Sequence, residues 1–117
     1  MAYQPWARID MRERHLCGVC SGLSDVRGAA RRNRHVFFCD ECGLGRAKEI
    51  GDMSSADLRQ LQKDALADAS PRIGAFLDTR LRKTDLAAMT EPEWLAFLAQ
   101  VVAEYGVSMR KLTGAPF

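Results

Sequence analysis

Residues 17–42 read CGVCSGLSDVRGAARRNRHVFFCDEC, and this stretch decides the fold. It holds all four cysteines of the chain, Cys17, Cys20, Cys39 and Cys42, in the pattern C-x2-C-x18-C-x2-C. Two thiolates separated by two residues fit on one tight turn about 3.7 Å apart, which spans one edge of a tetrahedron around Zn²⁺. Two such turns supply four ligands, so we expect one structural zinc ion with no open position for water or substrate.

Other chemistries of paired cysteines fit the sequence less well. A thioredoxin-like redox pair needs a single C-x-x-C at a strand-to-helix junction in a βαβ unit. Disulfides need an oxidising compartment, and nothing in the sequence indicates export. Iron in a four-thiolate site, or an iron–sulfur cluster, shares the ligand set, but the short Arg-rich segment between the pairs favours zinc. His15 or His35 could replace a cysteine, although four thiolates already saturate the ion.

The stretch from Cys17 to Ile50 resembles the N-terminal zinc-binding domain of the ClpX unfoldase family. That family shares the spacing between the pairs, a Ser and a Val-Arg after the first pair, an apolar strand, and a Cys-Asp-Glu-Cys second knuckle that enters a short helix. The corresponding residues here are Ser24, Val26, Arg27, Val36, Phe37, Phe38, Cys39 to Cys42 and the Ala47–Ile50 stretch. The resemblance implies a treble-clef-like fold.

The resemblance also carries an expectation about function, because ClpX-type modules dimerise and dock substrates or adaptors without catalysis. It implies that Val36, Phe37 and Phe38 pack against a partner or a second copy. We do not expect unfoldase activity, because the sequence contains no Walker A motif and leaves no room for an ATPase domain.

After Gly51-Asp52, which predicts a break, the pattern becomes helical. Ser54 precedes Asp57 in an arrangement close to a capping box. One face then carries Leu58, Leu61, Ala65, Leu66 and Ala69. Ser70-Pro71 ends or kinks this helix, and the pattern agrees equally with one kinked helix or two separate ones.

A further helix is predicted after a short turn or helix over residues 84–89. Thr90 and Glu93 form a T-x-x-E capping box with Pro92 in the first turn. A wide apolar stripe follows, made of Trp94, Leu95, Phe97, Leu98, Val101, Val102, Tyr105, Met109 and Leu112. At helical spacing these residues indicate core rather than a ligand-binding stripe. Gly106 weakens the helix locally, and Gly114 with Pro116 ends it.

The C-terminal half carries a second resemblance. It is similar to a family of small uncharacterised phage and prophage proteins that also have an N-terminal cysteine cluster. The residues that carry the similarity are Lys83 to Ala87, Met89-Thr90, Glu93-Trp94, Val101-Val102 and Tyr105. The resemblance covers roughly residues 54–112 and implies a phage- or prophage-encoded accessory protein, but it names no reaction.

Together these patterns predict an α+β chain in three parts. An N-terminal arm spans residues 1–16 and contains Tyr3, Pro5 and Trp6. Its aromatic side chains either pack against the zinc module or belong to a frayed arm. A treble-clef-like zinc module of knuckle, β-hairpin and short helix spans residues 17–52. A region of two to three α-helices spans residues 53–117. Because so few helices bury little surface, pairing with a second copy is a hypothesis for the helical part.

Charge is concentrated between the cysteine pairs. Residues 1–50 hold nine basic and six acidic side chains, whereas residues 51–117 hold eight and nine. The segment between Val26 and Phe38 has no acid and contains Arg27, Arg31, Arg32 and Arg34. Such an Arg-rich hairpin tip is either a solvated loop or a contact to nucleic-acid phosphates, with weak and salt-dependent binding.

Composition and missing motifs narrow the function. The net charge of +2 implies neither a nucleic-acid nor a membrane partner by itself. No apolar run approaches the roughly 20 residues that span a bilayer, and the N-terminus lacks a secretory signal, so we expect a location in the cytoplasm of a bacterial or phage-infected cell. Without H-E-x-x-H or a Gly-rich phosphate loop, we expect no enzyme. The sequence favours an adaptor- or inhibitor-like protein-interaction module, with nucleic-acid binding as the alternative.

Overall fold

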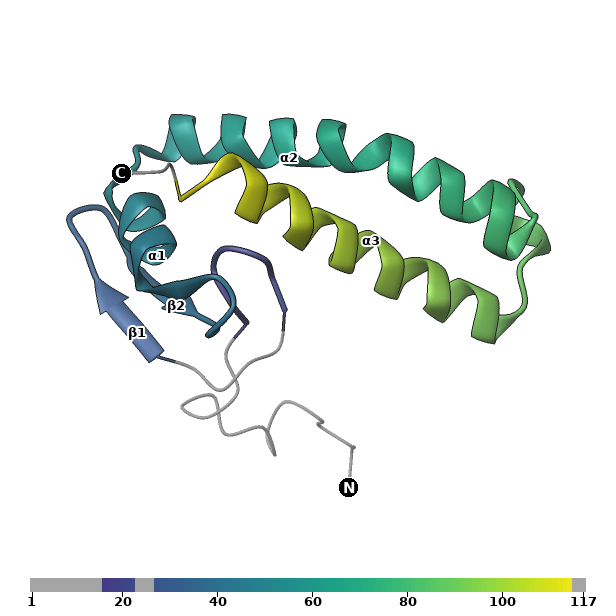
Figure 1. The fold of residues 1–117 in the computed structure, drawn as a ribbon, viewed down its shortest axis with the longest axis horizontal. Coiled ribbons are helices and arrows are strands. Elements are labelled where there is room, and N and C mark those ends of the chain that lie inside the picture. Colours follow the sequence, from purple (N-terminus) through teal and green to yellow (C-terminus); the bar gives the residue numbers. More distant parts are fainter. Residues whose placement is uncertain (1–15, 23–26, 115–117) are drawn as a thin grey trace, which may run out of the picture.

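The computed structural model describes residues 16–22 and 27–114. In chain order the elements are β1 (Arg27–Ala30), β2 (His35–Phe38), α1 (Gly43–Asp52), α2 (Ser55–Phe76), the π-helix η2 (Leu77–Leu81), the 3₁₀-helix η3 (Leu86–Ala88) and α3 (Glu91–Leu112). The predicted α+β class is confirmed: a small hairpin and a short helix surround the cysteines, and α2 and α3 form a long helical hairpin (Figure 1). The expectations for Tyr3, Pro5, Trp6, His15, Ser24, Val26 and Pro116 lie outside the described residues.

The N-terminal module is built on a two-stranded antiparallel sheet. Strands β1 and β2 pair with Arg27 opposite Phe38 and Ala30 opposite His35. The turn over residues 17–20, which we call the first knuckle, is hydrogen-bonded to this sheet. The Gly18 amide donates to the Phe37 carbonyl at 2.7 Å. Inward-facing apolar side chains of the knuckle, the strands and α1 form one core, which includes Val19, Ala29, Val36, Phe38, Ala47 and Ile50.

Helix α1 continues through the glycine that predicted a break. It ends at Asp52, and the chain turns only at Met53. A Cβ atom on Gly51 would lie 2.5 Å from Cβ and Cγ of Arg31, so glycine here lets the helix approach the hairpin turn. The break therefore lies one residue beyond the predicted Gly51-Asp52, and Gly51 serves packing rather than termination.

Helix α2 is one continuous helix through Pro71. Its start is capped as predicted, because the Ser54 hydroxyl accepts from the Asp57 amide at 3.1 Å. A proline inside a helix costs about 3 kcal/mol, so tertiary contacts must offset it. Next to Pro71, Arg72 pairs with Glu104 of α3, and Ala69 is fully buried. These contacts to α3 explain why the helix does not end at Ser70.

Helix α3 begins with the predicted capping box. The Thr90 hydroxyl accepts from the Glu93 amide, and the Glu93 carboxylate accepts from the Thr90 amide at 2.9 Å. The helix passes Gly106 and ends at Leu112, before Gly114 at φ 68°. Within the described part of the chain, no helix combines the length and the hydrophobicity that crossing a membrane requires.

The core between α2 and α3 is narrower than the sequence predicted. Its buried side chains are Ala65, Ala69, Ser108 and Met109, with Leu58, Leu61 and Tyr105 partly buried beside them. Several members of the predicted apolar faces are exposed instead: Leu66 on α2, and Trp94, Leu95, Leu98, Val102 and Leu112 on α3. The reason is that α2 covers one side of α3, and the N-terminal module covers only the C-terminal half of another side (Figure 1).

Candidate metal centre

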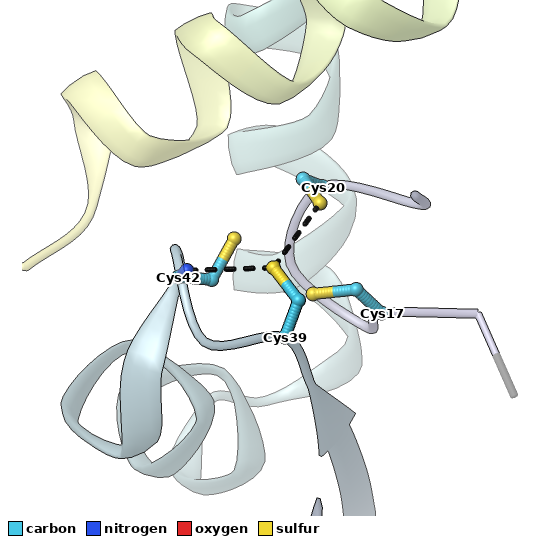
Figure 2. A group of neighbouring side chains, drawn as sticks. All are labelled: Cys17, Cys20, Cys39 and Cys42. Carbon is cyan, nitrogen blue, oxygen red and sulfur yellow. Dashed lines mark hydrogen bonds between the residues drawn. The ribbon is translucent and has the colours of Figure 1, made fainter. Parts of the chain in front are cut away.

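The structure brings the four cysteine sulfurs into one cluster. All four Sγ atoms lie within 4.8 Å of one another. Cys17 and Cys20 come from the turn before β1, Cys39 follows β2, and Cys42 stands at the start of α1 (Figure 2). The Sγ atoms of Cys20 and Cys39, which belong to different pairs, are 3.8 Å apart. This separation is close to the edge of about 3.7 Å that a tetrahedral four-thiolate zinc site requires.

The two knuckles share a backbone feature that follows from their geometry. The residue after the second cysteine of each pair takes a positive φ, 62° at Ser21 and 81° at Gly43. This left-handed turn folds the chain back, and it costs a non-glycine residue roughly 1–2 kcal/mol. Glycine at position 43 avoids the cost, whereas serine at position 21 bears it. The second knuckle is therefore the less strained of the two.

Backbone amides point at the sulfurs. The amide of Val19 donates to Cys17, that of Gly22 to Cys20, and that of Cys42 to Cys39, each at 3.4 Å. A divalent metal with four thiolates leaves two net negative charges, and such donors spread that charge. These three backbone amides would therefore stabilise the charge of metal-bound thiolates.

A side chain 68 positions away in the sequence adds a positive charge to the site. Arg110 of α3 donates from Nη1 to Cys42 Sγ at 3.8 Å, and its Nη2 lies 3.4 Å from the Glu41 carboxylate. Arg46 of α1 fixes the same region, because it donates to the Arg110 carbonyl at 3.2 Å and to the Cys42 carbonyl at 3.0 Å. The metal centre is thus enclosed by α1 and α3 as well as by its own turns.

Proton affinities within the metal-free cluster differ between its members. Burial alone would raise the pKa of Cys17, but the backbone amides of Cys20, Cys39 and Val19 outweigh it and bring that pKa to about 7. Burial dominates at Cys20 and Cys42, and it raises both pKa values above the ordinary thiol range. A metal that binds here must therefore displace protons from buried thiols.

The donor set matches a metal site by its own chemistry. Four sulfur atoms at mutual distances suited to a tetrahedron, three amide donors and a nearby guanidinium fit a thiophilic ion such as Zn²⁺. The four cysteines are positioned to bind one metal ion. His35, the alternative ligand that four thiolates make unnecessary, packs its ring against Phe37 at a centroid distance of 4.8 Å.

Sequence reasoning missed the residues that join the metal centre to α3. Gly106 was expected to weaken the helix, but a Cβ atom there would lie 3.0 Å from Cys20 Cβ. The glycine lets α3 lie directly on the first knuckle. No sequence pattern indicated the roles of Arg46 and Arg110, because contacts between residues far apart in the chain leave no such pattern. A glycine in the middle of an otherwise strong helix was the only available hint.

The four arginines of the alternative phosphate contact are not equivalent. Arg31 pairs with Asp52, with Nη2 and Oδ2 2.8 Å apart, and Arg34 donates to the Ile50 carbonyl. Both therefore fasten the hairpin turn to the C-terminal end of α1. Arg27 and Arg32 are exposed, on β1 and in the turn. The arginines thus do not gather at one tip, because Arg27 lies at the opposite end of the hairpin from the turn.

The apolar strand predicted as a partner surface is largely interior. Val36 and Phe38 are only 3% and 7% exposed, because their side chains pack into the core of the N-terminal module. Phe37, on the opposite side of β2, is half-buried beside His35. The prediction is therefore corrected for Val36 and Phe38, since alternation along a strand places neighbouring residues on opposite faces.

Comparisons with known proteins add no family and no function to this chain. No known protein-family model, no curated protein and no solved structure matches the chain. The resemblances to ClpX-type modules and to small phage proteins therefore stand on the motifs alone. The α+β fold and the four-cysteine cluster are the findings on which a function has to be argued.

Proposed function

We propose that this chain is a zinc-binding, non-catalytic protein-interaction module whose docking surface is the exposed apolar side of α3. We call this surface the α3 face and define it as Trp94, Leu95, Leu98 and Val102. Their exposed fractions are 39%, 56%, 41% and 45%. Exposed apolar side chains are ordinary when scattered, but a contiguous row of this kind is typical of a binding surface.

The observation that carries the proposal is the lack of charge in the middle of α3. Ten consecutive residues, Trp94 to Ala103, contain no charged side chain. A helix that packs on one neighbour normally carries charges on its free side. Here the free side offers leucine, valine and alanine to solvent, which is unfavourable unless another surface covers it. We therefore assign the α3 face to a protein partner.

The metal has a structural part in this proposal. A closed site of four thiolates leaves no position for a substrate and generates no nucleophile. Zn²⁺ would instead hold the first knuckle against Gly106 and the second knuckle against Arg110, next to the C-terminal end of the α3 face. Structural zinc contributes an apparent ~10–16 kcal/mol to folding in small modules, which is large for a chain of this size.

The biological setting follows from the resemblances. ClpX-type modules dock adaptors and substrates, which supports an adaptor- or inhibitor-like role. The similarity of the C-terminal half to small phage proteins supports a phage- or prophage-encoded accessory protein that acts in the cytoplasm of its host.

A capture experiment tests the proposal. The zinc-loaded chain is immobilised as wild type, as Leu95→Asp and as the control Leu66→Asp, which alters an equally exposed leucine on α2. We expect purified host proteins to bind the wild type and the control, and to be lost from Leu95→Asp. Equal capture by all three would contradict a docking role for the α3 face.

Nucleic-acid binding through Arg27, Arg31, Arg32 and Arg34 has less support, because two of these arginines already hold the hairpin turn. The alternative is tested with labelled duplex and single-stranded DNA at low and physiological salt. Micromolar binding that weakens with salt and vanishes when Arg31, Arg32 and Arg34 become alanine would favour it over a protein partner. The triple variant must retain zinc, since Arg31 and Arg34 also support α1.

A further inference from the structure

We infer that the four-cysteine cluster is a peroxide-sensitive switch, in which Cys39 and Cys20 form a disulfide and the metal ion is released. This inference rests on the proposed function, since it names how the proposed zinc site is regulated. It follows from three observations: the unequal exposure of the four cysteines, the short distance between two sulfurs of different pairs, and the contact of Cys20 with α3.

Cys39 is the least buried of the four cysteines. The other three are at most 8% exposed, whereas Cys39 is half-buried. The susceptibility of a cysteine to oxidation follows its thiolate character and its exposure. In a metal site all four sulfurs are thiolates, so exposure is what distinguishes them. We therefore place the first oxidation at Cys39.

The sulfur of Cys20 is positioned to complete the reaction. It lies 3.8 Å from the sulfur of Cys39, although 19 positions separate the two cysteines in the sequence (Figure 2). A disulfide bond is about 2.05 Å long, so the two sulfurs have to approach each other by less than about 2 Å. Because Cys20 belongs to the first knuckle and Cys39 to the second knuckle, residues 39–42, this bond would link the two knuckles.

The remaining two sulfurs are less suited to this exchange. Cys42 accepts a hydrogen bond from the Arg110 guanidinium, and a thiolate beside a cation is a weaker nucleophile. Cys17 is 1% exposed and is therefore the most enclosed of the four. Cys20, in contrast, lines a cavity of about 290 Å³ between the first knuckle and α3, which leaves it room to move.

The reaction balances with hydrogen peroxide as the oxidant. The Cys39 thiolate attacks one peroxide oxygen, the oxygen–oxygen bond breaks and hydroxide leaves, so that Cys39 becomes a sulfenic acid. The Cys20 thiolate then attacks the Cys39 sulfur, a sulfur–sulfur bond forms, and the sulfenic oxygen leaves as a second hydroxide. One peroxide is consumed for each disulfide, and its oxygens take up two electrons from the two thiolates. Only Cys17 and Cys42 then remain as thiolates, and two ligands do not complete a tetrahedral site.

The contact between Cys20 and α3 carries the effect to the helical hairpin. A Cβ atom on Gly106 would lie 3.0 Å from Cys20 Cβ, so Cys20 does not change its position without altering this contact. The hairpin has a separate connection far from the cysteines, because Arg72 of α2 pairs with Glu104 of α3. Oxidation should therefore loosen the N-terminal module from α3 and leave α2 and α3 packed together.

Peptide mapping tests the inference, because trypsin separates the two knuckles. Cleavage at the flanking arginines places Cys17 and Cys20 in the peptide of residues 15–27, and Cys39 and Cys42 in that of residues 35–46. The zinc-loaded full chain is treated with hydrogen peroxide, a chromophoric chelator records the zinc set free, and the remaining thiols are alkylated before digestion. We expect zinc release in step with a disulfide that joins the two peptides through Cys20 and Cys39. Disulfides confined to either peptide, or zinc release without a disulfide, would overturn the inference.

Two histidine variants separate the reactive cysteine from its neighbours. Three cysteines and one histidine form an ordinary structural zinc site, so Cys39→His and the matched control Cys17→His keep four ligands. Cys39→His should release zinc about tenfold or more slowly than the wild type under peroxide. Cys17→His should release it like the wild type and form the same disulfide. Release from Cys39→His at the wild-type rate would contradict the role of Cys39. If a variant binds no zinc, the peptide map of the wild type decides.

Hydrogen exchange tests the effect on the hairpin. In the oxidised chain the amides around Gly106 should exchange faster, whereas those around Arg72 should be unchanged, and a reductant with added zinc should restore the original rates. Equal exchange around Gly106 before and after oxidation would overturn the coupling to α3. A chain that takes up no zinc at all would refute the proposed zinc site together with the switch. A zinc-loaded chain that peroxide leaves intact would refute the switch alone and leave the proposed function standing.

Discussion

Arg110 Nη1 lies 3.8 Å from Cys42 Sγ, although 68 residues separate the two in the sequence. The contact joins the last turn of α3 to the second knuckle. Nη2 of the same guanidinium lies 3.4 Å from the Glu41 carboxylate. The metal centre and the helical hairpin are therefore one structural unit, and changes in one should be measurable in the other.

Replacing Arg110 should weaken metal binding while all four ligands remain. In Arg110→Ala the Cys42 sulfur loses its cationic donor, and residues of this kind around a metal site typically contribute 10- to 100-fold in affinity, so we expect a loss of about that size. Competition with a chromophoric zinc chelator measures it. Arg80→Ala, which changes an exposed arginine of η2, is the control and should bind zinc like the wild type.

Metal binding should release protons and weaken in acid. In the metal-free chain burial raises the pKa values of Cys20 and Cys42, so both are thiols at neutral pH and must lose their protons to the ion. We expect about one zinc per chain at pH 7.5 and progressive release as the pH falls toward 5. Titration calorimetry in buffers of different ionisation enthalpy counts the protons. Zinc retention by Cys39→Ser equal to that of the wild type would contradict the assigned ligand set.

The two glycines of α1 should respond in opposite ways to alanine. Gly43 has a φ of 81°, and a Cβ atom there would meet nothing within 4 Å, so Gly43→Ala should cost about 1–2 kcal/mol through the backbone alone. Gly45 is equally open but has an ordinary helical backbone, so Gly45→Ala should stabilise α1 by up to about 1 kcal/mol. Urea denaturation of the zinc-loaded chains measures both. A loss of stability in both variants would show that space, not backbone conformation, limits this knuckle.

The sequence predicted the local features of this molecule well. The cysteine spacing predicted the cluster of four cysteines. Ser54 and the Thr90–Glu93 capping box predicted the starts of α2 and α3. Each of these features depends on residues a few positions apart. It did not predict which side of α3 would be covered. That depends on Gly106 meeting Cys20, a contact between segments far apart in the chain.

The difference between local features and contacts between distant segments also explains the predictions that were wrong or left open. Val36 and Phe38 were assigned to a surface through the ClpX-type resemblance, but both are buried. Apolar residues in a strand can face either a core or a partner, so the sequence alone does not separate the two. The continuity of α2 through Pro71 likewise could not be decided locally, since it depends on the contact between Arg72 and Glu104. Where a second element provides the reason for a conformation, a periodic pattern alone leaves the alternatives open.

Asp68 should make the helical hairpin sensitive to acid. Hydrogen bonds from Lys111 at 2.9 Å and Ser108 at 2.7 Å, with a smaller contribution from Arg72, lower the pKa of this carboxyl from 3.8 to about 2. A folded-state pKa below the unfolded value means that the ionised carboxylate stabilises the fold above about pH 4 and that this contribution is lost as the pH falls toward 2. The wild type should therefore unfold at a higher temperature than Asp68→Asn at pH 5, and the difference should shrink by pH 2.5.

Because metal loss in acid affects both chains alike, the difference in unfolding temperature isolates the contribution of Asp68. Asp78→Asn, at an exposed position on η2, is the control. A gap between the wild type and Asp68→Asn that stays constant from pH 5 to pH 2.5 would mean that the carboxylate does not join α2 to α3.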